Sequence, residues 1–322
     1  MSAALDWICN FLYAAMLAGV PLLFGTLGEI LTEKAGNVNL GVEGMMYMGA
    51  VFGFMGAYYL DNTLAALAFA FLGGLSGALM YAFLTVTLKA NQNVAGLTLT
   101  IFGTGLANLL GTNMINSSGT GAAMISEGMK AIFRPLDMGA LSSLPYVGKL
   151  LFNHSLLTYL GIALAIGAGW YLNHTRCGLN LRAVGENPAA ADAAGVDVTA
   201  YKYVHTLLGG GICGLGGAYI ALVTCGGNWT YNCVGGLGWI AVALVIFAAW
   251  SPYKALLGSL VFGALSVLKL YIPASVVSIP SAFFSMLPFL VTCIILVISS
   301  IRMRRENQQP QACGVNYFRE ER

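Results

Sequence analysis

The sequence predicts an all-α, polytopic integral membrane helix bundle with about nine transmembrane helices, within bounds of eight to ten. Only 9% of the 322 residues are charged and 58% are apolar, whereas a soluble domain carries roughly 25% charged residues. No charged residue lies between Lys202 and Lys254, and only Asp61 lies between Glu43 and Lys89. This composition excludes a cytosolic enzyme and a disordered chain. A net charge of +2 also excludes a nucleic-acid binder.

A helix needs about 20 predominantly apolar residues to cross the hydrocarbon core of a bilayer. Because the long runs are apolar on every side, they predict helices and not the alternating strands of a barrel. By this measure nine spans are expected at residues 7–28, 44–60, 63–88, 94–115, 155–172, 203–224, 234–250, 256–272 and 282–301. The first span is flanked by Asp6 and not by basic residues, so it is interpreted as a span and not as a signal peptide.

Orientation follows from the excess of Lys and Arg in short cytoplasmic loops. The expected organisation is a permease domain over residues 1–301 and a cytoplasmic C-terminal tail over 302–322. A cytoplasmic loop at 174–202 and an outer loop at 116–154 connect the spans. A cytoplasmic tail places these cations on the same side: Lys34, Lys89, Arg176, Arg182, Lys202, Lys254, Arg302, Arg304, Arg305, Arg319 and Arg322. Lys130, Arg134, Lys149 and Lys269 fall outside or near the outer edge.

The first polar feature is the stretch 29–44 between the first two spans. Asn37, Asn39 and Glu43 alternate with apolar residues and run directly into the second span. One interpretation is a solvated cytoplasmic loop, in which Glu43 pairs with Lys34. The other is a chain that unwinds at membrane depth, because irregular backbone is tolerated there only inside protein or along a cavity. An ionisable residue inside a membrane is a functional candidate by default.

Two more polar stretches flank the fourth span. Asn91 and Gln92 form a polar turn that is followed by Thr98, Thr100 and Thr104. These residues are either a turn with hydroxyls bonded to their own helix or hydrogen-bonding groups along the path of a polar solute. The outer segment 116–154 is either an elaborate loop or a platform for an external partner.

The longest cytoplasmic loop predicts a short exposed helix. Asn187 and Pro188 fit the N-cap and first helical positions, an alanine run follows, and Gly195 is a stop signal. A helix surface made mostly of methyl groups suits insertion into the groove of another protein. The alternative is a solvated helix without a partner.

Catalytic and metal motifs are absent from the sequence. Gly148 and Lys149 are followed by Leu150 and lack the upstream glycine of a phosphate-binding P-loop. The glycine run at 209–214 lies inside an apolar span, where Gly210 and Gly214 predict close helix packing and not a dinucleotide site. The seven cysteines show no metal-ligand spacing, and no metal site is expected. Whether Cys225 and Cys233 form a disulfide is left open.

Four stretches of the chain resemble one known family. They are residues 32–50 (TEKAGNVNLGVEGMMYMGA), 90–97 (ANQNVAGL), 181–196 (LRAVGENPAAADAAGV) and 238–250 (GWIAVALVIFAAW). Together they resemble the membrane subunits of ATP-binding-cassette (ABC) importers for simple sugars and nucleosides, in the larger group that includes ribose and branched-chain amino-acid permeases. Where relatives often carry Arg between two glycines, this chain has Leu237, Gly238 and Trp239.

The resemblance implies a permease subunit of the bacterial inner membrane that moves a nucleoside or a simple sugar by alternating access, with a nucleoside as the first expectation. It implies a second, unlike permease subunit, a cytoplasmic ATPase that holds ATP and Mg²⁺, and an extracytoplasmic binding protein or lipoprotein; this chain itself needs no cofactor. It assigns ATPase coupling to Arg182, Gly185, Glu186, Asn187, Pro188, Ala191 and Gly195. The substrate pathway is expected at Asn37, Asn39, Glu43, Asn91, Gln92 and Trp239. The alternative is an ion-coupled secondary transporter, with Glu43 as the ion-carrying carboxylate.

Overall fold

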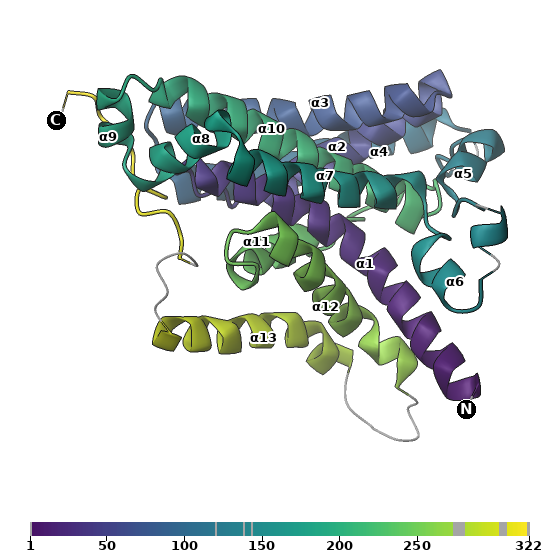
Figure 1. Cartoon of the computed structure of the whole chain (residues 1–322). Helices are drawn as coiled ribbons and strands as arrows, with labels where there is room; N and C mark the ends of the chain where they lie inside the picture. Colours follow the sequence, from purple (N-terminus) through teal and green to yellow (C-terminus); the bar gives the residue numbers. More distant parts are fainter. Residues whose placement is uncertain are drawn as a thin grey trace.

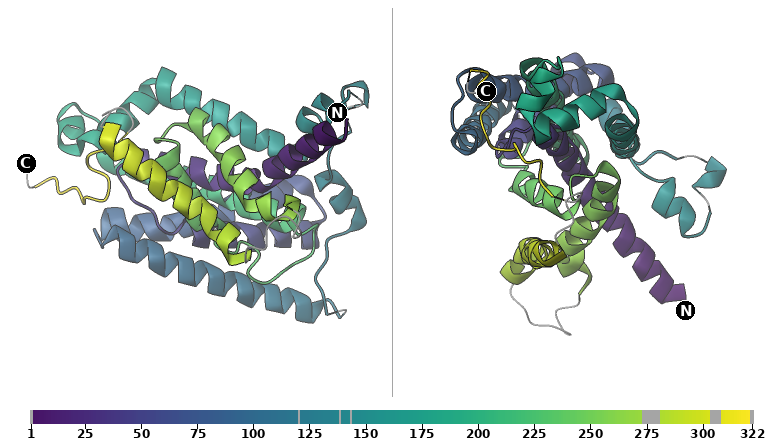
Figure 2. Two further views of the ribbon diagram at one scale, coloured as in Figure 1. Left: turned by 90° about the horizontal axis from the view of Figure 1, so that it is seen from below. Right: turned by 60° about the vertical axis from the view of Figure 1, so that its left-hand side comes forward.

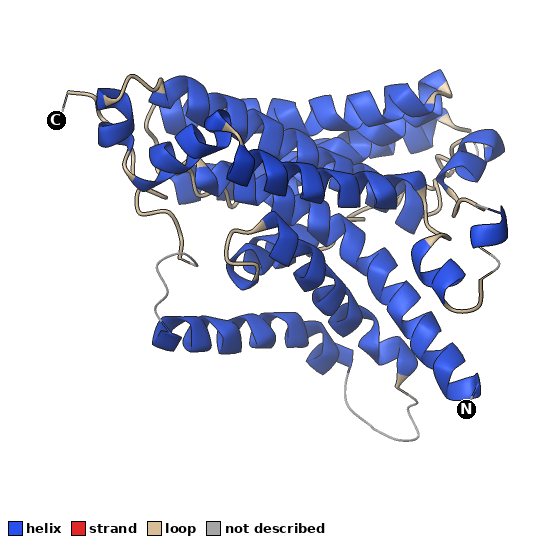
Figure 3. Cartoon of the chain, in the orientation of Figure 1, coloured by secondary structure: helices blue, strands red, loops and turns tan. Residues whose placement is uncertain are grey.

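A computed structural model describes residues 2–119, 121–137, 139–142, 144–272, 281–302 and 308–320. The described residues form helices joined by loops (Figure 3). Within these ranges the one β-type pairing is an isolated bridge between Met124 and Asn228. The all-α fold class is therefore confirmed.

The helices follow one another in this order: α1 Ser2–Lys34, α2 Val42–Leu60, α3 Thr63–Ala82 with its π-helical end η1 Phe83–Thr87, α4 Gln92–Ser117, α5 Glu127–Phe133, the short turn η2 Gly139–Leu141, α6 Val147–Leu151, α7 Leu156–His174, α8 Arg176–Glu186, α9 Pro188–Ala193, α10 Val198–Tyr219 with its π-helical end η3 Ile220–Thr224, α11 Leu237–Phe247, α12 Pro252–Tyr271 and α13 Ser281–Arg302. Figure 1 labels most of these elements.

Six helical stretches of the described residues are long and apolar enough to cross a membrane. They are Ala4–Lys34, Thr63–Thr87, Gln92–Ser117, Leu156–His174, Val198–Thr224 and Pro252–Tyr271. The span expected at 234–250 is wrong as a continuous helix, because α11 has only 11 residues, against the roughly 20 that a crossing requires. The total of about nine crossings stays a prediction.

The long helices run side by side between two distinct ends of the molecule (Figure 1). Helices α8 and α9 and the C-terminus lie at one end, called here the α9 end. Helices α5 and α6 and the N-terminus of α1 lie at the other, the α5 end. Helix α10 packs against α1, α2 and α3 at the centre. Helices α11, α12 and α13 form a second group beside α1, seen from below in Figure 2.

Glycines allow the central helices to approach closely. An added Cβ at Gly214 of α10 would overlap the Ala70 carbonyl oxygen and lie 3.0 Å from the Gly74 backbone. A Cβ at Gly210 would lie 2.8 Å from the Gly74 carbonyl oxygen. The predicted packing role of this glycine run is confirmed, since small residues let helix backbones come together in lipid.

Apolar side chains fill the interior and also cover much of the exterior. Large apolar residues face outward, with Leu64 and Ile101 78% and 76% exposed, while several charged and amide side chains are buried among the helices. Lipid is as apolar as leucine, so an apolar exterior costs nothing there. Buried polar residues are expensive in that setting and mark functional candidates.

Candidate translocation pathway and coupling surface

Residues 35–41, called here the buried loop, connect α1 to α2 inside the helix bundle. Asn37 and Asn39 are each 1% exposed and Glu43, in the first turn of α2, is 5% exposed. The interpretation of this stretch as a solvated loop is therefore wrong. The Leu40 carbonyl accepts a hydrogen bond from Thr100 Oγ1 at 3.1 Å, two turns into α4. The chain thus loses helical structure between packed helices, as the alternative interpretation predicts.

The two asparagines fix the buried loop to the neighbouring helices. Asn37 donates from Nδ2 to Thr206 Oγ1 of α10 at 3.1 Å. The Asn39 backbone N–H donates to Glu29 Oε1 of α1 at 2.9 Å. The Asn39 side chain accepts from the Gly41 N–H at 2.9 Å, which closes the turn into α2. Amide side chains here replace the backbone partners that a continuous helix would have supplied.

Glu43 joins the starts of two helices. Its Oε1 accepts from the Gly236 N–H at 2.8 Å and its Oε2 accepts from the Gly238 N–H at 2.6 Å. A carboxylate at this position suits the unsatisfied N–H groups and partial positive charge at the start of α11. The proposed pairing of Glu43 with Lys34 is wrong, since the carboxylate binds these backbone groups instead.

The chain reaches Glu43 from the α5 end through an irregular stretch, residues 225–236, called here the descending segment. The Tyr231 hydroxyl donates to Thr112 Oγ1 at 3.2 Å, and the Gly235 N–H donates to the Tyr47 hydroxyl at 3.1 Å. Helix α11 then continues from Glu43 toward the α9 end. The predicted span at 234–250 is thus replaced by an irregular stretch followed by a half-length helix. Such broken elements are tolerated only beside protein or a cavity.

The other predicted pathway residues occupy different positions. Trp239 lies in the first turn of α11, next to Gly238, and is half-buried. Gln92 is buried and accepts from the Val38 N–H of the buried loop at 2.7 Å. Asn91 is exposed and caps α4 by accepting from the Val94 N–H at 3.1 Å. The structure therefore brings Gln92 to the buried loop and leaves Asn91 at the helix end.

Two carboxylates that the prediction of pathway residues missed lie beside the buried loop. Glu29 is 0% exposed, and its Oε2 has no hydrogen-bond partner in the described part of the chain. Glu33 lies one turn further along α1 and accepts a hydrogen bond from Trp250 Nε1. The sequence does contain a signal for these two residues: they are four positions apart at the end of an apolar run, a spacing that puts both on one helix face.

The short helix of the long loop forms as predicted. Asn187 Oδ1 accepts from the Ala190 N–H at 3.0 Å, so Asn187 is the N-cap and Pro188 the first residue of α9. Gly195 has a φ of +85°. Its N–H donates to the Asp192 carbonyl at 2.9 Å, and the Val196 N–H donates to the Ala191 carbonyl at 3.0 Å. These bonds form a glycine C-cap of the Schellman type.

The residues assigned to coupling divide between the surface and the interior. Glu186, Asn187 and Gly195 are exposed, and Arg182 and Pro188 are half-buried. Gly185 and Ala191 are buried. An added Cβ at Gly185 would overlap the Lys34 carbonyl oxygen at the end of α1, so a bulky residue there would disturb internal packing. The surface open to a partner consists instead of the exposed residues Glu186, Asn187, Ala190, Ala193, Ala194 and Gly195.

Residues 308–320, called here the C-terminal strap, tie this surface to the buried loop. The Ala312 N–H donates to the Gly185 carbonyl at 3.0 Å, and the Gly314 N–H donates to the Gly36 carbonyl at 3.3 Å. Further along, the Tyr317 hydroxyl donates to Asp192 Oδ2 at 2.7 Å. A continuous set of contacts therefore joins α8 and α9 to the loop that leads into Glu43.

At the α5 end, the segments 123–125 and 227–229 are bound to each other. The Ile125 N–H donates to the Gly227 carbonyl at 3.0 Å, and the Trp229 N–H donates to the Ala123 carbonyl at 2.9 Å. Helix α5 carries an ion pair in which the half-buried Lys130 lies 2.9 Å from the exposed Glu127, and this hydrogen bond lowers the pKa of Glu127. Cys225 and Cys233 of the descending segment are both free thiols in the structure.

These features define a multi-span membrane protein with broken helices at a buried polar junction, which is the architecture of a solute permease. Residues 11–296 match the family described as the permease component of the branched-chain amino acid transport system. The chain belongs to this family. Members of this family are the permease components of transport systems and not enzymes.

The names of curated relatives agree with this family. The nucleoside ABC transporter permease protein NupC of Lactococcus lactis is 36% identical over 94% of this chain and 95% of its own length. The guanosine ABC transporter permease protein NupQ of Bacillus subtilis is 30% identical over 96% of each chain. TsgC13 of Haloferax volcanii, which is named for glucose ABC transport, is 37% identical over 83% of this chain and 78% of its own length. The glucose ABC transporter permease protein TsgB13 of that organism is 27% identical, over 78% and 67%.

Proposed function

We propose that this chain is the translocation subunit of an ATP-driven importer for a nucleoside and that it works by alternating access in the inner membrane. The observation that carries the proposal is the set of contacts from α9 through Gly185 and the C-terminal strap to the buried loop and Glu43. A displacement of α9 by a partner would be transmitted along these contacts to the junction of the two broken elements.

The solute is proposed from the relatives with the widest coverage. The two whose names specify a nucleoside or guanosine match this chain along nearly its whole length. The two relatives named for glucose match smaller shares of this chain, TsgC13 at 37% identity over 83% and TsgB13 at 27% identity over 78%. A purine nucleoside is therefore the first solute to test, with glucose as the second.

The partners follow from the family and the exposed face of α9. We expect a cytoplasmic ATPase that holds ATP and Mg²⁺ and docks on the α9 surface, which places the α9 end and the C-terminus in the cytoplasm. A second, unlike permease subunit completes the pathway. An extracytoplasmic binding protein or lipoprotein delivers solute to the paired segments at the α5 end.

The test is uptake by the assembled transporter. The chain is reconstituted in liposomes with its ATPase, second permease and binding protein, and ATP-dependent uptake of labelled guanosine is compared with that of glucose. Ala193→Arg, on the exposed face of α9, should abolish ATPase pull-down and uptake. Ala131→Arg, an exposed alanine of α5 at the other end, is the matched control and should leave ATPase pull-down intact.

Two outcomes would contradict the proposal. ATPase pull-down that is equal for both variants would show that α9 is not the docking surface. Guanosine uptake by the purified chain alone under a proton or sodium gradient, without ATP, would favour the ion-coupled alternative, in which a buried carboxylate such as Glu43 carries the ion.

A further inference from the structure

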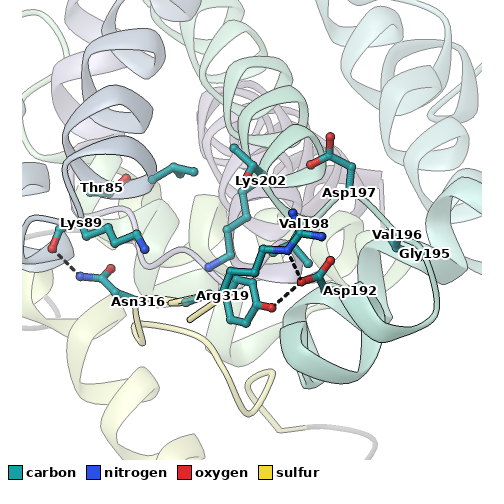
Figure 4. A pocket seen from close by; sticks show the side chains of 13 residues that line it. Thr85, Lys89, Asp192, Gly195, Val196, Asp197, Val198, Lys202, Asn316 and Arg319 are labelled. Atoms are coloured by element: carbon teal, nitrogen blue, oxygen red, sulfur yellow. Dashed lines mark hydrogen bonds and ion pairs between the residues drawn. The ribbon is translucent and has the colours of Figure 1, made fainter. Parts of the chain in front are cut away.

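A cavity of about 380 Å³ lies at the α9 end, apart from the junction at Glu43. Its walls come from η1 and the residues after it, the turn between α9 and α10, the start of α10 and the C-terminal strap (Figure 4). The charged residues in its lining are Lys89, Asp192, Asp197, Lys202 and Arg319. A volume of this size fits a small organic ligand.

Both acidic residues of the cavity already have partners. Asp192 Oδ2 accepts from the Tyr317 hydroxyl at 2.7 Å and lies 3.2 Å from Arg319 Nε. Asp197 Oδ1 accepts from the Ala200 N–H at 3.0 Å and caps the start of α10. Neither carboxylate bonds to the two lysines of the cavity, so the lining has an uncompensated positive charge.

Lys202 carries the argument because it is buried and unpaired. Its side chain is 4% exposed, yet none of the hydrogen bonds or ion pairs of the described residues involves its ammonium. Lys89 is half-buried, and its ammonium lies 4.0 Å from the centre of the Phe318 ring. Figure 4 shows the two lysine side chains extending into the same part of the cavity. An ammonium that is largely withdrawn from solvent and has no protein partner is expensive, so an anionic ligand in the cavity that Lys202 lines is the expected compensation.

We propose that this cavity binds a phosphate group through Lys202 and Lys89, with Arg319 at the rim. A phosphate offers several acceptor oxygens to converging cationic donors. The ligand would bridge α10, η1 and the C-terminal strap. It would thereby steady the strap that contacts Gly185 and Gly36, which makes the cavity a regulatory site separate from the solute pathway.

The test measures binding to the purified full-length chain in nanodiscs of neutral phosphatidylcholine. Inorganic phosphate is titrated calorimetrically at constant ionic strength, with chloride as the reference anion. Lys202→Met should weaken phosphate binding by about 10-fold to 100-fold, the usual range for a charge-assisted hydrogen bond. Lys202→Arg should restore most of it. Arg176→Met, an exposed cation on α8 at the same end, is the matched control and should bind like wild type.

The same titration in nanodiscs containing phosphatidylglycerol separates two sources of the phosphate group. Weaker phosphate binding there supports a lipid headgroup as the occupant, and unchanged binding supports a soluble phosphate compound. If Lys202→Met does not fold, Lys89→Met replaces it, with the same loss expected.

The absence of saturable phosphate binding in neutral nanodiscs, or equal binding by wild type and the lysine variants, would overturn the proposal. Because neither ATPase nor solute is present, such a failure leaves the proposed transport function intact. A failure of guanosine uptake likewise leaves the phosphate site intact.

Discussion

Replacing Glu43 by glutamine should weaken the junction between α2 and α11. The carboxylate accepts two backbone N–H groups, at 2.8 and 2.6 Å. Glutamine keeps one acceptor oxygen and turns its NH₂ group toward the other N–H, so one charge-assisted hydrogen bond is lost and one donor is left unsatisfied. Each effect is worth about 1–3 kcal/mol and the two overlap, so we expect about 2–4 kcal/mol of lost stability.

The assay for Glu43→Gln is the free energy of unfolding in detergent, followed by intrinsic tryptophan fluorescence, together with uptake by the reconstituted transporter. Glu43→Asp keeps the charge but is one methylene shorter, so its loss should be smaller if charge dominates. Glu127→Gln, which removes an acid of α5 whose ion pair is solvent-exposed, is the control and should cause a much smaller loss, because exposed ion pairs contribute little to stability. Equal stability of the Glu43→Gln and Glu127→Gln variants would refute the role assigned to Glu43.

Two further substitutions test the packing and the polar interior. Gly214→Leu should destabilise the bundle by about 1–3 kcal/mol or more through overpacking, because a Cβ there overlaps neighbouring backbone. Gly105→Leu on α4 places its side chain in open space and should leave stability unchanged. The melting temperatures of both variants test this, and a Gly214→Leu variant as stable as wild type would contradict the close crossing of the helices. Trp250→Phe removes the donor to the buried carboxylate of Glu33 and should cost about 1–3 kcal/mol. Trp170→Phe, which replaces an exposed tryptophan, should leave the melting temperature unchanged. Equal melting temperatures for the two phenylalanine variants would refute the contribution of the hydrogen bond between Trp250 and Glu33.

Local signals in the sequence determined much of the structure. Apolar runs of membrane length located the long helices, since a helix satisfies its own backbone hydrogen bonds and needs only an apolar exterior in lipid. The caps of α9 at Asn187 and Gly195 were also predictable, because their bonds join residues three to five positions apart. The expected role of Gly210 and Gly214 held for the same reason, as small residues four apart lie on one helix face.

The tertiary structure alone decided which polar residues meet. Glu43 binds Gly236 and Gly238 across 193 and 195 residues, and no periodicity connects positions so far apart. It also decided that Asn91 caps a helix end while Glu29 and Glu33 lie beside the buried loop. In composition, the apolar stretch at 234–250 resembles an intact span. An apolar composition predicts burial, but it does not show whether the backbone forms one continuous helix. Where a helix breaks depends on whether neighbouring helices supply partners for the freed N–H groups, and here Glu43 supplies them from a distant part of the chain.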